Sequence, residues 1–288
     1  MAMWERTRCS CRASASSALC ALVSLGLTLA ACGSAQTVGD DFSAYRQNLR
    51  QMYADGMDAL ADGNYAEAKK LFQALSGESR YVGYSVLAKL RLGDTLLAEG
   101  DHEAAEYVYD EFLQQYRGDP NEAYAHFRKC QTMEERIPGD WVILPPPESK
   151  DMTQARRANV CLREFLTRYP DSRFRSLVEK SYAGVRAMLY RHEKYVADYY
   201  WRHDGYDGLA GRAIGILRDY PEFVTEELYY RLVVSLVKAG DLTRATEYFK
   251  EYTSAFPEGR HVGDLRARLD DLSHGDGHGK ADGAQPAG

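Results

Sequence analysis

A pattern of one small and two bulky side chains recurs five times along this 288-residue chain. Its members stand at i, i+4 and i+7, a spacing that places all three on one face of an α-helix. The five sets are Ala68, Phe72 and Leu75; Ala105, Tyr109 and Phe112; Ala158, Leu162 and Phe165; Ala210, Ile214 and Leu217; and Ala245, Phe249 and Tyr252. Helical spacing without an alternating strand pattern favours an all-α fold.

Turn signals stand in register with this pattern. Five residues before four of the alanines there is a glycine, at Gly63, Gly100, Gly205 and Gly240. A glycine can end one helix in the left-handed conformation, and the Asn or Asp after three of these glycines can cap the next helix. Each unit resembles the tetratricopeptide repeat, a helical hairpin of about 34 residues. We expect an α-solenoid of about five such hairpins; the alternative is an irregular helical bundle in which the alanine spacing is coincidental.

The repeats are unequal in length. Successive alanines of the pattern are 37, 53, 52 and 35 residues apart. The third repeat carries an insertion, 137–150, with Trp141 and three consecutive prolines, and the fourth opens with an overlong helix, Ser172–His203, of roughly 45 Å. We therefore assign residues 42–171 to repeats one to three and 172–272 to repeats four and five. Residues 273–288 lack apolar anchors and are predicted to be a disordered tail.

The N-terminus has the features of an export signal. Arg6, Arg8 and Arg12 precede an uncharged stretch rich in small and apolar residues, which indicates a signal peptide over residues 1–31. The sequence Leu-Ala-Ala before Cys32 resembles the lipobox of bacterial lipoproteins. That resemblance implies lipid attachment at Cys32, a linker over 32–41 and, with Gly33 following, the outer membrane. The alternatives are an uncleaved anchor and an incidental cysteine.

Charge and motifs exclude several functions. The net charge of −6 and the absence of a basic stripe argue against nucleic-acid binding. We find no Gly-rich phosphate loop, no nucleophile elbow and no zinc-protease motif, so no catalytic residue, cofactor or metal site is predicted. Outside the leader and Cys32, only Cys130 and Cys161 remain. A disulfide between them is possible, but we favour two free buried cysteines.

Several runs, in order along the chain, resemble the BamD family of outer-membrane protein assembly lipoproteins. They are Gly63-Asn64-Tyr65, Pro120–Tyr124, Arg168–Phe174, Val196–Tyr200 and Leu217–Pro221. The resemblance implies a scaffold on the periplasmic face of the outer membrane, held there by its lipid anchor. Its implied partners are the POTRA domains of the insertase BamA, other Bam lipoproteins and unfolded outer-membrane protein precursors. The competing interpretations are a periplasmic repeat lipoprotein for pilus assembly or cell-envelope coordination and, less favoured, the docking arm of an enzyme.

The same resemblance points to candidate binding residues. Arg212, Glu193, Tyr199 and Tyr200 would contact the insertase, with Arg212 pointing out of its hairpin toward an acidic group. The alternative for Arg212 is a solvent-exposed residue that pairs loosely with Asp207 or Asp219.

Tyr53 and Tyr84 are predicted to be exposed in an N-terminal groove for client peptides. Ordinary packing between helices is the alternative for both.

Overall fold

The computed structural model describes residues 37–78, 82–138 and 151–275, and every regular element in these ranges is a helix. The α-helices are α1 (Thr37–Ala61), α2 (Tyr65–Ser76), α3 (Val82–Glu99), α4 (His102–Gln115), α5 (Glu122–Glu135), α6 (Thr153–Arg168), α7 (Arg175–Arg202), α8 (Tyr206–Asp219), α9 (Glu226–Lys238), α10 (Leu242–Ala255) and α11 (Val262–Gly275). A short 3-10 helix, η2 (Pro221–Phe223), follows α8. The prediction of an all-α repeat fold is confirmed.

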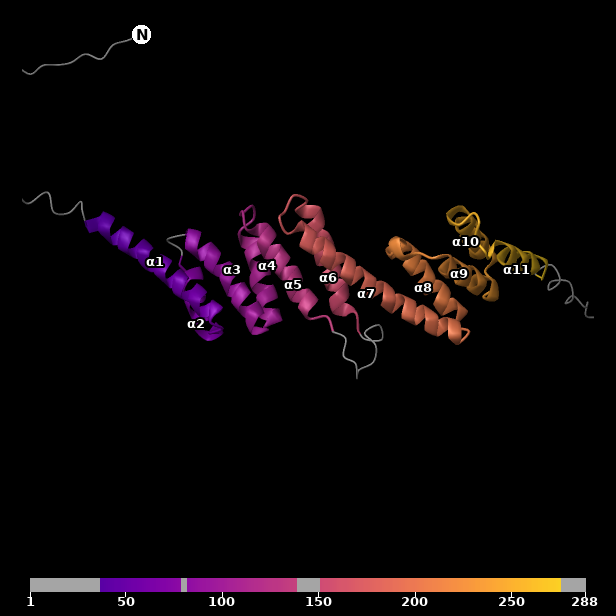
Figure 1. Ribbon diagram of the computed structural model, residues 1–288, viewed down its shortest axis with the longest axis horizontal. Coiled ribbons are helices and arrows are strands. Elements are labelled where there is room, and N and C mark those ends of the chain that lie inside the picture. The colour runs from indigo at the N-terminus through magenta and orange to yellow at the C-terminus, as the bar shows by residue number, and fades with distance from the viewer. Residues whose placement is uncertain (1–36, 79–81, 139–150, 276–288) are drawn as a thin grey trace, which may run out of the picture.

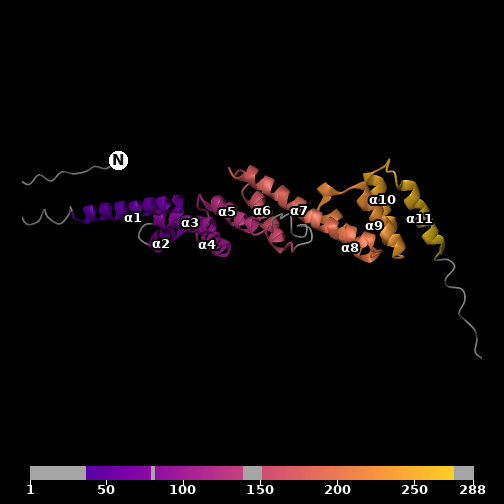
Figure 2. The ribbon, with the colours of Figure 1, turned by 60° about the horizontal axis from the view of Figure 1, so that its bottom comes forward.

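The helices form an elongated row of hairpins. Five hairpins follow one another along the long axis of the described part, and α11 ends the row (Figure 1). The hairpins are α1/α2, α3/α4, α5/α6, α7/α8 and α9/α10. The turned view in Figure 2 shows the same extended arrangement. Each helix packs mainly on the helices before and after it in the chain. Stacking of this kind leaves long surfaces open for partners.

The turns follow the expected chemistry at three of four positions. Gly63, Gly100 and Gly240 have positive φ, and the side chains of Asn64, Asp101 and Asp241 accept hydrogen bonds from the first turns of α2, α4 and α10.

The prediction is wrong for Gly205. Its φ is −80°, and Asp204 takes the left-handed conformation instead. A Cβ on Gly205 would lie 2.7 Å from the ring of Tyr200, so close packing accounts for this glycine.

The repeated pattern lies in the core in four of its five occurrences. The sets of α2, α4 and α6 are fully buried, and in α10 Ala245 and Tyr252 are buried. In α8 the face is rotated. Leu209, Ala213 and Ile216 are buried, whereas Ile214 and Leu217 are only partly so, because α8 packs against the long α7 on one side and α9 on the other.

The long helix α7 joins two halves of the solenoid. Val178, Val185 and Leu189, in its first part, belong to the core shared by α5, α6 and α7. Tyr200 and Trp201, at its end, pack against the core formed with α8, α9 and α10. The extra length therefore continues one helix through two hydrophobic cores.

The preference for free cysteines is wrong. Cys130 of α5 and Cys161 of α6 form a disulfide, with their Cα atoms 5.5 Å apart. Hairpin geometry brings the two residues within bridging distance, and an oxidising compartment favours the bond. The disulfide ties the two helices that flank the insertion.

Helix ends differ from the assigned boundaries at both ends of the chain. The first helix begins at Thr37, inside the expected linker, and α11 continues to Gly275, three residues into the expected tail. The signal peptide, Cys32, residues 139–150 and the rest of the tail lie outside the described residues. Within the described ranges, none of the helices combines the length and the apolar character needed to span a bilayer.

Candidate partner-binding surface

Arg212 and Glu193 meet on one face of the C-terminal half. Arg212 of α8 donates from Nη1 to Glu193 Oε2 of α7 at 2.6 Å, and Arg156 of α6 donates to Glu193 Oε1 at 3.1 Å. The side chain of Glu193 is only 15 % exposed, whereas that of Arg212 is 40 % exposed. Glu193 thus holds two arginines from two neighbouring helices, and Arg212 reaches toward solvent above it.

The side chain of Arg212 is partly exposed, and its ion pair is with Glu193 of the neighbouring helix rather than with Asp207 or Asp219. Among the described residues, its Nε and Nη2 atoms make no other hydrogen bond. One edge of the guanidinium is therefore fixed, and the other is available to a second carboxylate.

An open cavity of about 440 Å³ surrounds this ion pair. Arg212, Glu193 and Tyr200 line it, together with Arg156, Asp207 and Arg218. Gly211 and Gly215 also line the cavity, and a Cβ at either would meet no atom within 4 Å. The backbone of α8 is consequently bare here, so a partner can approach it closely.

The two tyrosines at the end of α7 face different ways. Tyr200 lines the cavity and packs against Gly208, whose added Cβ would lie 2.7 Å from the Tyr200 ring. Tyr199 is 51 % exposed and stacks on His203, with ring centroids 4.2 Å apart. The structure therefore brings Arg212, Glu193 and Tyr200 together and leaves Tyr199 on an adjacent surface.

Tyr53 and Tyr84 lie side by side between α1 and α3. Their ring centroids are 5.9 Å apart, and the Tyr53 ring also packs on Phe72. Both side chains are partly buried rather than exposed. The hydroxyl of Tyr53 accepts a hydrogen bond from Arg91 Nε at 3.1 Å. The two tyrosines are thus part of the packing between helices, and each stays partly exposed.

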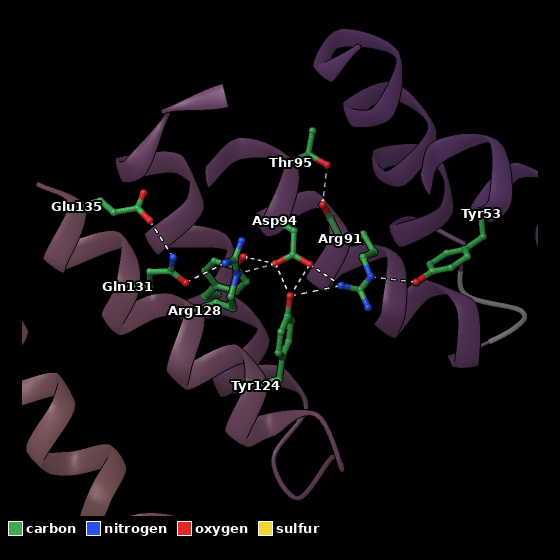
Figure 3. A network of polar contacts seen from close by, with 9 residues as sticks. Tyr53, Arg91, Asp94, Thr95, Tyr124, Arg128, Gln131 and Glu135 are labelled. Atoms are coloured by element: carbon green, nitrogen blue, oxygen red, sulfur yellow. Dashed lines mark hydrogen bonds and ion pairs between the residues drawn. The ribbon is translucent and has the colours of Figure 1, made fainter. Parts of the chain in front are cut away.

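A buried polar network behind Tyr53 was not predicted from the sequence. Asp94 of α3 accepts hydrogen bonds from Arg91 Nη1 at 2.6 Å, the Tyr109 hydroxyl at 2.6 Å, the Tyr124 hydroxyl at 2.8 Å and Arg128 Nε at 3.0 Å (Figure 3). Its donors come from α3, α4 and α5, and Arg91 extends the network to α1. The only sequence signal was an aspartate on the core-facing side of α3, three residues after an arginine.

The environment of this carboxylate shifts the neighbouring groups. Burial, reinforced by the Asp94 charge, raises the pKa of Tyr124 to about 12 and also raises the pKa of Tyr109. Both phenols therefore remain protonated donors at neutral pH. The network joins three repeats to one another, and Arg91 links it to the hydroxyl of Tyr53 on α1.

One group of metal-ligand side chains is found in the described part of the chain. His126 lies beside Cys130 and Cys161, and all three are buried. The two sulfurs are joined as the disulfide, so they are not free thiolates. Burial lowers the pKa of His126 to about 4.

Comparisons with known proteins agree with this architecture. Residues 46–231 match the model of the family described as YfiO, outer membrane lipoprotein. The outer membrane protein assembly factor BamD of Haemophilus influenzae is 24 % identical over 234 residues, covering 76 % of this chain and 87 % of the relative. The BamD of Neisseria meningitidis serogroup B is 25 % identical over 241 residues, covering 78 % and 88 %.

Two further matches are more limited. The BamD of Xylella fastidiosa strain 9a5c is 25 % identical over 179 residues, covering 60 % of each chain. Among solved structures, a MamA RS-1 double mutant aligns with a TM-score of 0.33 and 14 % identity, covering 79 % of this chain and 96 % of that one. The family model itself spans well over half of the sequence, and the chain therefore belongs to the YfiO family of outer membrane lipoproteins.

Proposed function

We propose that this chain is a lipid-anchored scaffold of the machinery that assembles β-barrel proteins in the outer membrane. Its relatives in Haemophilus influenzae and Neisseria meningitidis carry the name outer membrane protein assembly factor. A solenoid of helical hairpins suits this role because it offers separate surfaces to several partners. In this proposal the C-terminal repeats bind the POTRA domains of the insertase BamA, other Bam lipoproteins share the scaffold, and the N-terminal repeats receive unfolded precursors.

The proposed insertase contact rests on the guanidinium of Arg212, of which only one edge is bonded to Glu193. Glu193 orients it through Nη1, and Arg156 holds Glu193 in turn. The free Nε and Nη2 edge matches the two oxygens of a carboxylate, which a lysine cannot reproduce. The bare backbone at Gly211 and Gly215 lets such a carboxylate approach. Glu193 is then a positioning residue, Tyr200 provides aromatic surface inside the cavity, and Tyr199 provides it on the adjacent surface.

Copurification of the insertase from detergent-solubilised outer membrane tests this contact. We expect Arg212→Glu to lower the affinity by at least about 30-fold, since truncating a buried interfacial charge pair costs roughly 2–5 kcal/mol. Arg218→Glu is the matched control, because Arg218 lies on the same helix, lines the same cavity and is 75 % exposed. Arg218→Glu should mainly alter the salt dependence of insertase binding.

Arg212→Lys separates charge from geometry in this test. It keeps the positive charge beside Glu193 and removes the planar fork, so we expect it to bind more weakly than the wild type. Circular dichroism of each variant establishes that the helices are intact. Wild-type copurification by a folded Arg212→Glu variant would show that this arginine is not the contact.

The N-terminal part of the proposal rests on the paired rings of Tyr53 and Tyr84. We expect precursor segments that end in an aromatic residue to contact their exposed edges. Photo-crosslinking from either position should capture barrel precursors, and crosslinking from the exposed Tyr107 on α4 is the control. Equal capture from all three positions would contradict the proposal that precursors bind at Tyr53 and Tyr84.

Anchoring at Cys32 is tested separately. We expect Cys32→Ser to release the protein into the soluble periplasmic fraction or to leave the leader uncleaved. An unmodified Cys32 in the intact mass of the membrane-extracted protein would contradict lipid attachment.

A further inference from the structure

A second open groove lies between α5 and α7, away from Arg212. Its volume is about 680 Å³. The apolar side chains that line it are Phe127, Ile137, Pro138, Leu177, Val185 and Met188. Leu177 is 54 % exposed, and a Cβ added to Gly184 would meet no atom within 4 Å. A large apolar residue is thus left facing solvent beside a bare stretch of helix.

The groove exists because the first helices of repeats three and four separate. In the N-terminal half, the first helices of successive hairpins touch, α1 against α3 and α3 against α5. The corresponding helices α5 and α7 have almost no backbone contact, and α6 packs between them on the other side. A gap between successive first helices is a place where repeat proteins can accept a peptide segment.

Glu134 gives this groove a chemical preference. Several other shielded carboxylates pair with arginine, as Glu106 does with Arg136 and Arg157, and Glu193 does with Arg156 and Arg212. Glu134 is partly buried and forms no ion pair within the described residues.

Few groups around Glu134 offset the cost of shielding its negative charge from water. It has a hydrogen bond with Ser181, and its neighbour Glu135 adds a second negative charge to the rim. Burial raises the pKa of Glu134. The exposed Lys180 also lines the groove but does not pair with it.

We propose that this groove binds a peptide segment that presents an apolar side chain next to a lysine or arginine. The apolar residue would cover Leu177 and Met188, and the basic group would neutralise the unpaired carboxylate of Glu134. From Leu177 to Met188 the helix rises about 16 Å, the length of roughly five residues of extended peptide. This site is independent of the insertase contact and does not require it.

Fluorescence anisotropy with the purified mature protein in detergent tests the proposal. The probes are three short labelled peptides with centres Leu-Leu-Lys, Leu-Leu-Glu and Ser-Ser-Lys in the same flanking sequence. We expect the Leu-Leu-Lys peptide to bind at least about tenfold more tightly than the other two, because it alone supplies both the apolar contact and a partly buried charge pair. Because no insertase is present, failure here would leave the proposed function untouched.

Three variants locate the binding. Glu134→Gln should abolish the preference for Lys over Glu, and Leu177→Asp should weaken the Leu-Leu-Lys peptide about tenfold. Glu164→Gln removes the same charge from an exposed position on α6 outside the groove and should have no effect. Leu177 and Glu134 are not core residues, and circular dichroism checks that their variants fold.

Two results would overturn the proposal. One is equal binding of the three peptides, or a Lys preference that survives in Glu134→Gln. The other is a concentration-dependent dimer in sedimentation that Leu177→Asp abolishes, which would make a second copy of the chain the occupant.

Discussion

Removal of the Asp94 carboxylate should destabilise the N-terminal half of the solenoid. Asp94 is buried and accepts four hydrogen bonds from three helices, two of them from arginines. In Asp94→Ala, the fully buried Tyr109 hydroxyl loses the acceptor of its hydrogen bond, at a cost of about 1–3 kcal/mol. The arginines also lose their counter-charge.

The total loss of stability in Asp94→Ala depends on how well water can reach the two arginines. Breaking a fully buried ion pair costs about 3–5 kcal/mol. The side chains of Arg91 and Arg128 are 30 % and 21 % exposed, so solvent can partly replace the lost carboxylate. We therefore expect Asp94→Ala to lower the free energy of unfolding by about 3–4 kcal/mol, and Asp94→Asn, which keeps one acceptor oxygen, by less.

Urea denaturation followed by circular dichroism measures this loss. Asp110→Asn is the matched control on α4, because Asp110 forms a single ion pair, with Lys129, and its side chain is 39 % exposed. Its cost should stay below about 1 kcal/mol. Tyr109→Phe in the Asp94→Ala background should cost much less than in the wild type, because the acceptor is already gone. An Asp94→Ala protein within 1 kcal/mol of the wild type would refute this reasoning.

Other expectations follow from local packing and titration. Replacing Cys130 and Cys161 by alanine should lower the free energy of unfolding by about 3–4 kcal/mol in chemical denaturation, as the loop-closure entropy for a separation of 31 residues predicts; an unchanged midpoint would contradict it. Gly93→Ala puts a Cβ 2.7 Å from the Tyr109 ring and should cost about 1–3 kcal/mol, whereas Gly211→Ala meets no atom and should be neutral or stabilising; equal melting shifts would argue against this packing. The pKa of buried His126 is lowered to about 4, so the unfolded chain binds a proton at this residue more readily than the folded one. The free energy of unfolding should therefore be highest above pH 6.5 and fall by up to about 3 kcal/mol as the pH drops toward 4. A His126→Gln protein with the same acid profile would exclude this histidine as the cause.

Much of the local architecture could be read from the sequence. The spacing of Ala68, Phe72 and Leu75 predicted a buried helical face, and all three are buried. Asn64 after Gly63 predicted a turn and a cap, and both are present. These features depend on interactions within a few residues along the chain, where helical geometry fixes which side chains meet. The family resemblance was likewise legible in short runs, and residues 46–231 match that family.

Predictions failed where two helices had to be placed relative to each other. The sequence predicts a left-handed turn glycine at Gly205, but the ring of Tyr200, which packs onto α8, is what requires a glycine there. Arg212 pairs neither with Asp207 nor with Asp219 on its own helix, because its partner Glu193 lies 19 residues away on α7. The buried face of α8 is rotated for the same reason, since its neighbours on both sides decide which residues are covered.

The sequence by itself determined that this chain forms successive helical hairpins. It also determined where most turns fall and which side chains form the buried faces of α2, α4 and α6, because those properties follow from the 3.6-residue period and from capping. Only the tertiary structure decided the rest: the disulfide between α5 and α6, the carboxylate of Asp94 with donors from three helices, and the groove in which Glu134 has no arginine partner among the described residues. Each of these depends on the distance and angle between separate helices. Those distances are set by the packing of whole faces, which no short stretch of sequence encodes.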